Sequence, residues 1–207
     1  MEGVERTTQV SLEGKPVSKR TLDSEDRSSL DYETAAGEAQ RCLHCACYAV
    51  NPSDLTPVLV MSDAKIRTTE REISAKELFT QKLTVQHILH KGELVKEIIV
   101  PKKAGVMNYE KRRVRDAIDF AIVSLASAFT CEDGVIKSAR LVYGGVAPVP
   151  YELTEVDEFL EGKHADAGLA KEAAELAVKH VTPMGRNEYK VHMAKDVVYN
   201  AVMKCVQ

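Results

Sequence analysis

The chain has 207 residues, a net charge of −3 and a sequence pI near 6.1, with 44% apolar and 29% charged residues. This is the balance of an ordinary globular protein, and it excludes the strongly basic surface typical of nucleic-acid-binding proteins. No apolar run approaches the roughly 20 residues that a membrane-spanning helix needs, so we expect no membrane partner. The N-terminal residues lack the apolar core of a secretory signal, so we expect a cytoplasmic protein with reduced cysteines.

The N-terminal part of the chain is polar until it reaches a group of cysteines. Residues 1–33 lack apolar periodicity and predict an extended arm or a disordered leader. A helical pattern with small residues follows at residues 32–41 and runs directly into Cys42-Leu43-His44-Cys45-Ala46-Cys47. Thiolates at this spacing can converge on one metal, and iron–sulfur clusters and structural zinc both use them, usually four to a site. Cys42, Cys45 and Cys47 are therefore candidate metal ligands, with ordinary reduced thiols at a helix end as the alternative.

A fourth ligand for such a site is not evident nearby. Cys131 and Cys205 are distant in the sequence, and Cys205 lies on the apolar stripe of a predicted helix, where core packing is the favoured interpretation. Residues 38–45 resemble the start of the cluster-binding segment in the glutamate synthase small subunit and dihydropyrimidine dehydrogenase. Those families carry further cysteines after it, and this chain departs from their pattern at residues 49–54.

Short elements follow the cysteines. Asn51-Pro52-Ser53-Asp54 is a turn signal that ends in a candidate helix cap, and residues 55–64 then predict a short apolar helix. The weak alternation of residues 65–73 indicates a strand. Ser74 and Glu77 have the spacing of a capping box, which predicts a short helix after residue 74. Residues 94–100 predict a strand that Pro101 closes.

Residues 117–146 give the clearest signal in the chain. Two apolar runs, residues 117–129 and 135–146, flank Glu132-Asp133-Gly134. Asp-Gly between apolar runs is a strong hairpin signature. Because both faces of the first strand are apolar, we expect it to be central in its sheet and covered on both sides.

Three helices are predicted after the hairpin, each with one apolar stripe. The first begins at Thr154, which is a candidate cap, and the stripe of the second ends at His180, which we expect to be packed. The stripes are Val156, Phe159 and Leu160; Leu169, Ala173, Leu176, Ala177 and His180; and Val191, Ala194, Val198, Ala201, Val202 and Cys205. The predicted fold class is α+β, with an antiparallel sheet packed against a C-terminal group of helices.

From Cys47 onward, over about three quarters of the chain, the order of features resembles the FAD-binding (medium) subunit of the xanthine dehydrogenase, carbon monoxide dehydrogenase and 4-hydroxybenzoyl-CoA reductase family, in its C-terminal portion. The matching stretches, in order, are residues 51–55, 60–65, 74–79 and 91–101, Tyr109-X-Lys111 with Arg113 and Arg115, Asp119-Phe120-Ala121, Ala139-Arg140, Gly144-Gly145-Val146-Ala147-Pro148-X-Pro150, and residues 158–163.

The resemblance implies an electron-transfer subunit of a molybdenum-hydroxylase-like oxidoreductase that binds FAD and works with molybdopterin-binding and iron–sulfur subunits. It also implies cofactor-binding roles near the flavin for Asp54, Leu94 and Lys111. Charges and hydrogen bonds close to a flavin tune its electronic properties. The alternative for Asp54 is a helix cap. The alternative for Lys111 is a solvated basic strip with Arg112, Arg113 and Arg115.

Two departures from the family pattern shape the functional hypothesis. The family holds the FAD pyrophosphate on a glycine-rich loop of its N-terminal subdomain, and no such loop appears here. Glu152 stands where the family often carries Arg. We therefore expect FAD binding only with a partner chain; the alternative is a non-catalytic adaptor or metal-stabilised interaction module without flavin, and a homo-oligomer stays open.

Three regions are expected. Residues 1–40 form a polar N-terminal extension. Residues 41–92 hold the cysteine cluster and a short helical remnant of the FAD-binding subdomain. Residues 93–207 form an α+β domain like the C-terminal domain of the flavoprotein.

Overall fold

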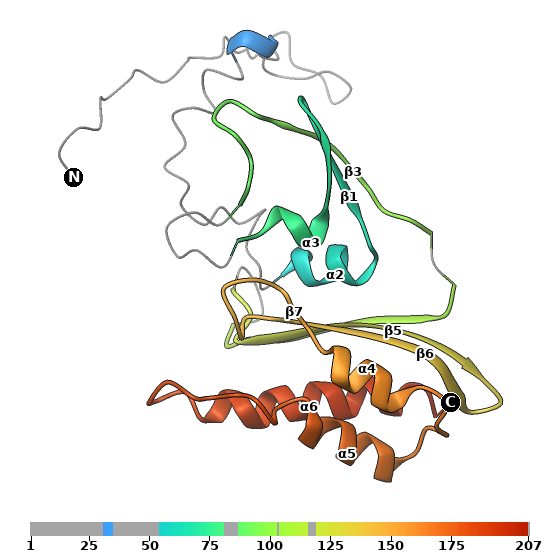
Figure 1. Ribbon diagram of the computed structural model, residues 1–207. Helices are drawn as coiled ribbons and strands as arrows, with labels where there is room; N and C mark the ends of the chain where they lie inside the picture. The colour runs from blue at the N-terminus through green and yellow to red at the C-terminus, as the bar shows by residue number, and fades with distance from the viewer. Residues whose placement is uncertain (1–30, 35–53, 81–86, 103, 116–118, 207) are drawn as a thin grey trace, which may run out of the picture.

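The computed structural model describes residues 31–34, 54–80, 87–102, 104–115 and 119–206. Figure 1 shows their layers: a four-stranded sheet in the middle, the helices α4, α5 and α6 below it, and α2, α3 and a three-stranded sheet above it. Both sheets are antiparallel. The α+β class with C-terminal helices against the sheet is thus confirmed.

The upper layer contains the helical remnant that the sequence predicts. Its elements are α2 (Leu55–Met61), β1 (Lys65–Thr68), β2 (Glu72–Ser74), α3 (Ala75–Leu78) and β3 (Val95–Ile99), with strand order β2-β1-β3. The capping box is confirmed, because Ser74 Oγ accepts from the Glu77 N–H at 3.1 Å and Glu77 Oε2 accepts from the Ser74 N–H at 3.1 Å. Since β3 pairs with β1, hydrogen bonds cross the expected boundary at residue 92, and that boundary stays a prediction.

The single strand predicted over residues 65–73 is wrong. The chain reverses after Thr68, and residues 65–74 form the β1–β2 hairpin instead. The Thr68 hydroxyl accepts from the Arg71 N–H at 2.9 Å and from the Glu70 N–H at 3.1 Å. A side-chain oxygen therefore closes this turn, without glycine or proline.

The middle sheet is built on the predicted hairpin, which is confirmed. Its strands are β4 (Val106–Arg112), β5 (Val123–Glu132), β6 (Val135–Gly144) and β7 (Tyr151–Glu152), in that order across the sheet. Asp133 and Gly134 join β5 to β6 with φ of 49° and 75°, the positive values that tight hairpin turns require. The first strand of the hairpin, β5, starts at Val123 instead of at residue 117 as predicted. Strand β4 was not predicted from the sequence.

Strand β5 is covered on both faces, as its sequence predicts. Leu125 and Phe129 belong to the core between the sheet and the lower helices, and both are at most 2% exposed. The side chain of Ala126 points to the opposite face of β5, where it packs in a second core with residues of α2, β1 and α3. The central strand therefore holds two apolar layers together.

The lower helices bury the predicted stripes. They are α4 (Thr154–Leu160), α5 (Ala167–Leu176) and α6 (Tyr189–Met203). Two details differ from expectation: Thr154 is the first helical residue and no side chain caps α4, and His180 follows α5 with its side chain 60% exposed. Its ring nitrogen instead contacts Glu155 at 3.2 Å.

Charged residues connect the upper layer to the sheet. Arg140 of β6 lies 2.8 Å from Glu152 and 3.1 Å from Asp63, and Glu152 also pairs closely with Lys76 of α3. Glu152, the charge-reversed position, is thus matched by two cations of this chain.

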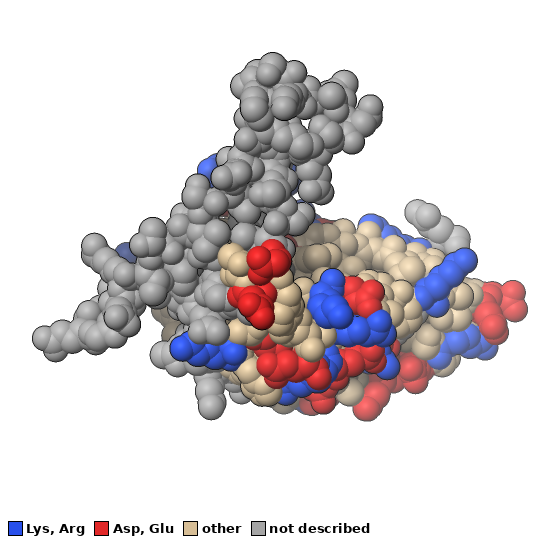
Figure 2. Space-filling model, turned by 90° about the horizontal axis from the view of Figure 1, so that it is seen from above, with Lys and Arg blue, Asp and Glu red and all other residues tan. Residues whose placement is uncertain are grey.

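Figure 2 shows Lys and Arg interspersed with Asp and Glu over the described part of the face that it presents. Among the described helices, none combines the length and apolar character that a bilayer crossing requires.

Candidate functional site

Asp54 and Lys111 meet where α2 begins above the sheet. Lys111 Nζ lies 2.6 Å from Asp54 Oδ1, and the two side chains are only 20% and 17% exposed. The ammonium also donates to the Asp119 carbonyl at 2.6 Å. Lys111 is on β4 opposite Ser124 of β5, and α2 packs against β5 and β6, so helix packing brings the two charges together.

The simpler interpretations of both residues are wrong. Asp54 precedes α2, but its carboxylate makes no capping hydrogen bond to the helix. Lys111 is mostly buried, whereas Arg113 and Arg115 of the basic strip are exposed. Both side chains therefore point into one cluster instead of into solvent or onto a helix end.

The Asp54 carboxylate keeps unused acceptor capacity. Lys111 and Tyr109 are its close partners, but neither carboxylate oxygen has a hydrogen bond of good geometry among the described residues. The short contact with Lys111 is thus an ion pair of poor hydrogen-bond geometry. A buried carboxylate in this state favours a further donor, such as a hydroxyl or an N–H of a ligand.

Tyr109 is a third member of the cluster; the sequence analysis includes it in the matching stretch Tyr109-X-Lys111 but assigns it no role in the site. Burial raises the pKa of its phenol, a hydrogen bond with Ser124 lowers it, and the negative charge of Asp54 and a hydrogen bond with that carboxylate raise it again. Tyr109 precedes Lys111 by two residues, so both lie on the same face of β4. This spacing would have indicated Tyr109 if the strand had been predicted.

Leu94 lies away from this cluster. It contacts the β1–β2 turn, where its N–H donates to Thr69 Oγ1 at 3.3 Å and its carbonyl accepts from the Thr69 N–H at 2.9 Å. In Figure 1 this turn is at the end of the three-stranded sheet that points away from the middle sheet. Among the described residues, the hydrogen bonds of Leu94 go to Thr69 and not to Asp54 or Lys111, and its cofactor role stays a prediction.

The candidate metal ligands Cys42, Cys45 and Cys47 lie outside the described residues. Cys205 is 5% exposed and belongs to the main core, so core packing is confirmed for it. Burial and a hydrogen bond with Cys131 raise the pKa of Cys205 to about 12. Its thiol is therefore protonated near neutral pH, which is unfavourable for binding a metal.

A second polar cluster surrounds Glu93, just before β3. The Glu93 carboxylate accepts from the Thr68 hydroxyl at 2.6 Å, from Arg71 Nε at 3.1 Å and from the His90 N–H at 2.7 Å. His90 Nδ1 lies 2.7 Å from Glu70, so Glu70, His90 and Glu93 are close enough to share a metal. Because Glu93 is already satisfied by protein donors, we assign this cluster a structural role that fastens β3 to the β1–β2 turn.

Comparison with known protein families gives a match over the sheet and the lower helices. Residues 108–205 match the model of the CO dehydrogenase flavoprotein C-terminal domain. The match begins within β4 and ends after α6. It includes Tyr109 and Lys111, but not Asp54.

Curated relatives extend the similarity upstream. The chain is 30% identical over 156 residues to the glyceraldehyde dehydrogenase medium chain of Sulfolobus acidocaldarius, covering 73% of this chain and 55% of that one. It is 29% identical over 159 residues to an aldehyde oxidoreductase FAD-binding subunit of Escherichia coli, covering 72% and 47%. The chain thus spans about half the length of these two relatives.

Solved structures share the fold. Quinoline 2-oxidoreductase from Pseudomonas putida 86 superposes with a TM-score of 0.69 at 21% identity, over 83% of this chain and 60% of that one. CO dehydrogenase from Oligotropha carboxidovorans gives a TM-score of 0.65 at 24% identity, over 76% and 59%.

Proposed function

We propose that this chain is part of an FAD-binding, electron-transfer subunit of a molybdenum-hydroxylase-like oxidoreductase, because residues 108–205 match the CO dehydrogenase flavoprotein C-terminal domain. The observation that carries the proposal is the half-buried Asp54–Lys111 pair, two of the three residues for which the family resemblance implies a flavin role. The names of two relatives, a dehydrogenase medium chain and an FAD-binding subunit, support it.

The residues of the cluster fit a flavin. The Asp54 carboxylate would accept a hydrogen bond from a ribityl hydroxyl or a ring N–H, and the Lys111 ammonium would donate one to a flavin oxygen. When bound, FAD supplies the two-electron chemistry that links a donor to an acceptor. A cation held beside the flavin favours its reduced, anionic form, so Lys111 would raise the reduction potential.

A partner polypeptide would supply the phosphate-binding half of the site. No described loop joins several glycines to the start of a helix, which is where a pyrophosphate is usually held. Apolar side chains are exposed by 42–54% on two consecutive strands at the edges of their sheets: Val95, Ile98 and Val100 on or after β3, and Val106 and Met107 on β4. Exposed apolar strands of this kind are typical of surfaces that another polypeptide covers.

The test is to purify the complex that the chain forms with the polypeptides encoded beside it, and to measure FAD per chain from the visible flavin spectrum. We expect bound FAD in the wild-type complex. Lys111→Met and Asp54→Asn should each weaken FAD retention by about tenfold, because the first removes a charged hydrogen-bond donor and the second removes the charge of an acceptor. Lys111→Met should also lower the midpoint potential of the flavin that remains.

The matched control is Arg113→Met, which removes an exposed cation from the same basic strip. It should leave FAD content and potential unchanged. Equal loss in Arg113→Met and Lys111→Met would show a general charge effect and would contradict the proposed site. A stable complex without flavin would support the adaptor interpretation, which no observation among the described residues favours at present.

The cysteine cluster is a separate proposal. Cys42, Cys45 and Cys47 would hold an iron–sulfur cluster or zinc that completes an electron path or fastens a partner subunit. Iron and zinc analysis of anaerobically purified protein, with Cys42→Ser/Cys45→Ser as the comparison, tests it. Equal metal content in both proteins would contradict it. Cytoplasmic location also stays a prediction.

A further inference from the structure

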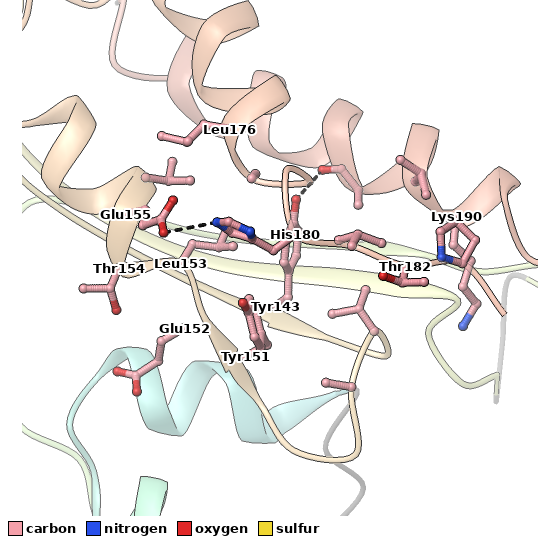
Figure 3. Close-up of a pocket in the computed structure, with 18 of the residues that line it drawn as sticks. Tyr143, Tyr151, Glu152, Leu153, Thr154, Glu155, Leu176, His180, Thr182 and Lys190 are labelled. Carbon is pink, nitrogen blue, oxygen red and sulfur yellow. Dashed lines mark hydrogen bonds and ion pairs between the residues drawn. The ribbon is translucent and has the colours of Figure 1, made fainter.

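A cavity of about 460 Å³ lies between the end of the sheet and the lower helices, on the side of the sheet away from α2. Its walls come from β6, β7, α4, the end of α5 and the start of α6 (Figure 3). Most of the lining is apolar and includes Val146, Tyr151, Val156, Val181, Met184 and Val191. The volume falls in the range of small-molecule sites.

The cavity follows from the path of the chain. Helix α5 ends at Leu176, and the chain forms no further helix or strand until α6 begins at Tyr189; several residues of this connecting segment line the cavity. Tyr143 forms part of the cavity wall, but its hydroxyl donates to the Ala194 carbonyl at 2.7 Å. Because Tyr143 is only 2% exposed, its ring backs the cavity wall, and the accessible apolar lining comes from Val146, Tyr151 and Val181.

The two carboxylates around the cavity each have a basic partner, whereas Lys190 has no acidic partner among the described residues. Glu152 pairs with Arg140 and Lys76, and Glu155 pairs with His180 at 3.2 Å. Lys190 Nζ donates to the Gly145 carbonyl at 3.1 Å, and no carboxylate of the described residues pairs with it.

Figure 3 places Lys190 at one side of the cavity and the Glu155–His180 pair at the other, with Tyr143 between them. The lining therefore offers one uncompensated positive charge next to an apolar chamber.

We propose that this cavity binds an apolar monocarboxylate, with the carboxylate at Lys190 and the apolar body along Tyr151 and Val181. The apolar part of the ligand would bury the apolar lining residues away from water. Its carboxylate would form an ion pair with the Lys190 ammonium. A polyanion is disfavoured, because Lys190 is the one lysine of the described lining and supplies a single unmatched positive charge. None of its lining residues belongs to the Asp54–Tyr109–Lys111 cluster, so this site is independent of FAD binding.

The experiment is a calorimetric titration of the full-length chain with octanoate, and with octan-1-ol as the neutral counterpart. We expect saturable binding of both to the wild type. Lys190→Met should weaken octanoate binding about tenfold and leave octan-1-ol binding unchanged, because only the anion uses the ammonium. Lys190→Arg keeps the charge and should restore most of the octanoate affinity.

Two further variants complete the design. Lys195→Met removes a cation of the same helix that already pairs with Glu175, and it should bind octanoate like the wild type. Val191→Phe adds volume inside the cavity and should weaken both ligands. Equal octanoate affinity in the wild type and Lys190→Met, undiminished binding in Val191→Phe, or no saturable octanoate binding would each overturn the proposal.

Discussion

The Tyr143 hydroxyl donates a 2.7 Å hydrogen bond to the Ala194 carbonyl, and this bond joins the central hairpin to the last helix inside the main core. Burial raises the pKa of Tyr143, so the phenol stays protonated and can donate at any ordinary pH.

Tyr143→Phe should therefore lower the free energy of unfolding by about 1 kcal/mol, since it removes one buried hydrogen bond and keeps the ring. Urea unfolding followed by circular dichroism measures the change. Tyr151→Phe, at a 45% exposed position, is the control and should be nearly neutral. Equal effects of the two substitutions would argue against a structural role for the Tyr143–Ala194 bond.

Asp157 should make stability depend on pH. Burial raises the pKa of its carboxyl from 3.8 to about 7, although the Leu141 N–H, which donates to it at 2.9 Å, opposes the shift. Between these two values the folded state holds a proton that the unfolded state releases, so this contribution to stability falls as pH rises from about 4 to 7.

Asp157→Asn should accordingly gain stability relative to the wild type as the pH is raised from 5 to 8. The amide oxygen can still accept from Leu141, and it carries no charge to desolvate. Urea unfolding of both proteins at the two pH values gives the comparison. A difference that does not change with pH would rule out a raised pKa at this residue.

Glu93 should have the opposite pH dependence. Burial alone would raise the pKa of its carboxyl, but hydrogen bonds from Arg71, Thr68 and the His90 N–H lower it to about 2. Because the folded value lies below 4.5, the stabilisation is present above pH 4.5 and is lost as pH falls toward 2. Glu93→Gln should be destabilised at pH 7 and approach the wild type near pH 2.5, as thermal melting at several pH values would show. Glu97→Gln, on the exposed face of β3, should track the wild type throughout.

Gly105, just before β4, allows the backbone to pass close to Phe129 of β5 because it has no side chain. Its φ is +112°, and a Cβ built there would lie 2.2 Å from the Phe129 carbonyl oxygen. Gly162 also has a positive φ, +76°, but open space around it. Gly162→Ala should cost about 1 kcal/mol from backbone strain alone, and Gly105→Ala about 3 kcal/mol or more because the backbone must also move. Chemical unfolding of the pair separates strain from collision; similar losses would contradict the difference.

Elements with local signals were predictable from the sequence. Asp133-Gly134 between apolar runs and the stripes of the last three helices depend on short-range spacing, and all of them form. Strand β4 was missed because residues 106–112 bury little, and pairing with β5 is what keeps them extended. The β1–β2 turn was missed because Thr68, instead of glycine or proline, closes it.

The candidate site was predictable only in part. The family resemblance points to Asp54 and Lys111, but their meeting depends on how α2 packs on β5 and β6, which local patterns do not contain. The buried state of Lys111 and the neighbourhood of Tyr109 follow from the same packing. The sequence therefore indicated candidate residues for the site, but not the distances between their side chains.

The open edges of β3 and β4 have a practical consequence. Among the described residues no strand pairs with the outer edge of either one, and each carries exposed apolar side chains. Such edges are templates for intermolecular strand addition, so the isolated chain should aggregate as its concentration rises, and recombinant yield should improve when the natural neighbours are produced in the same cell.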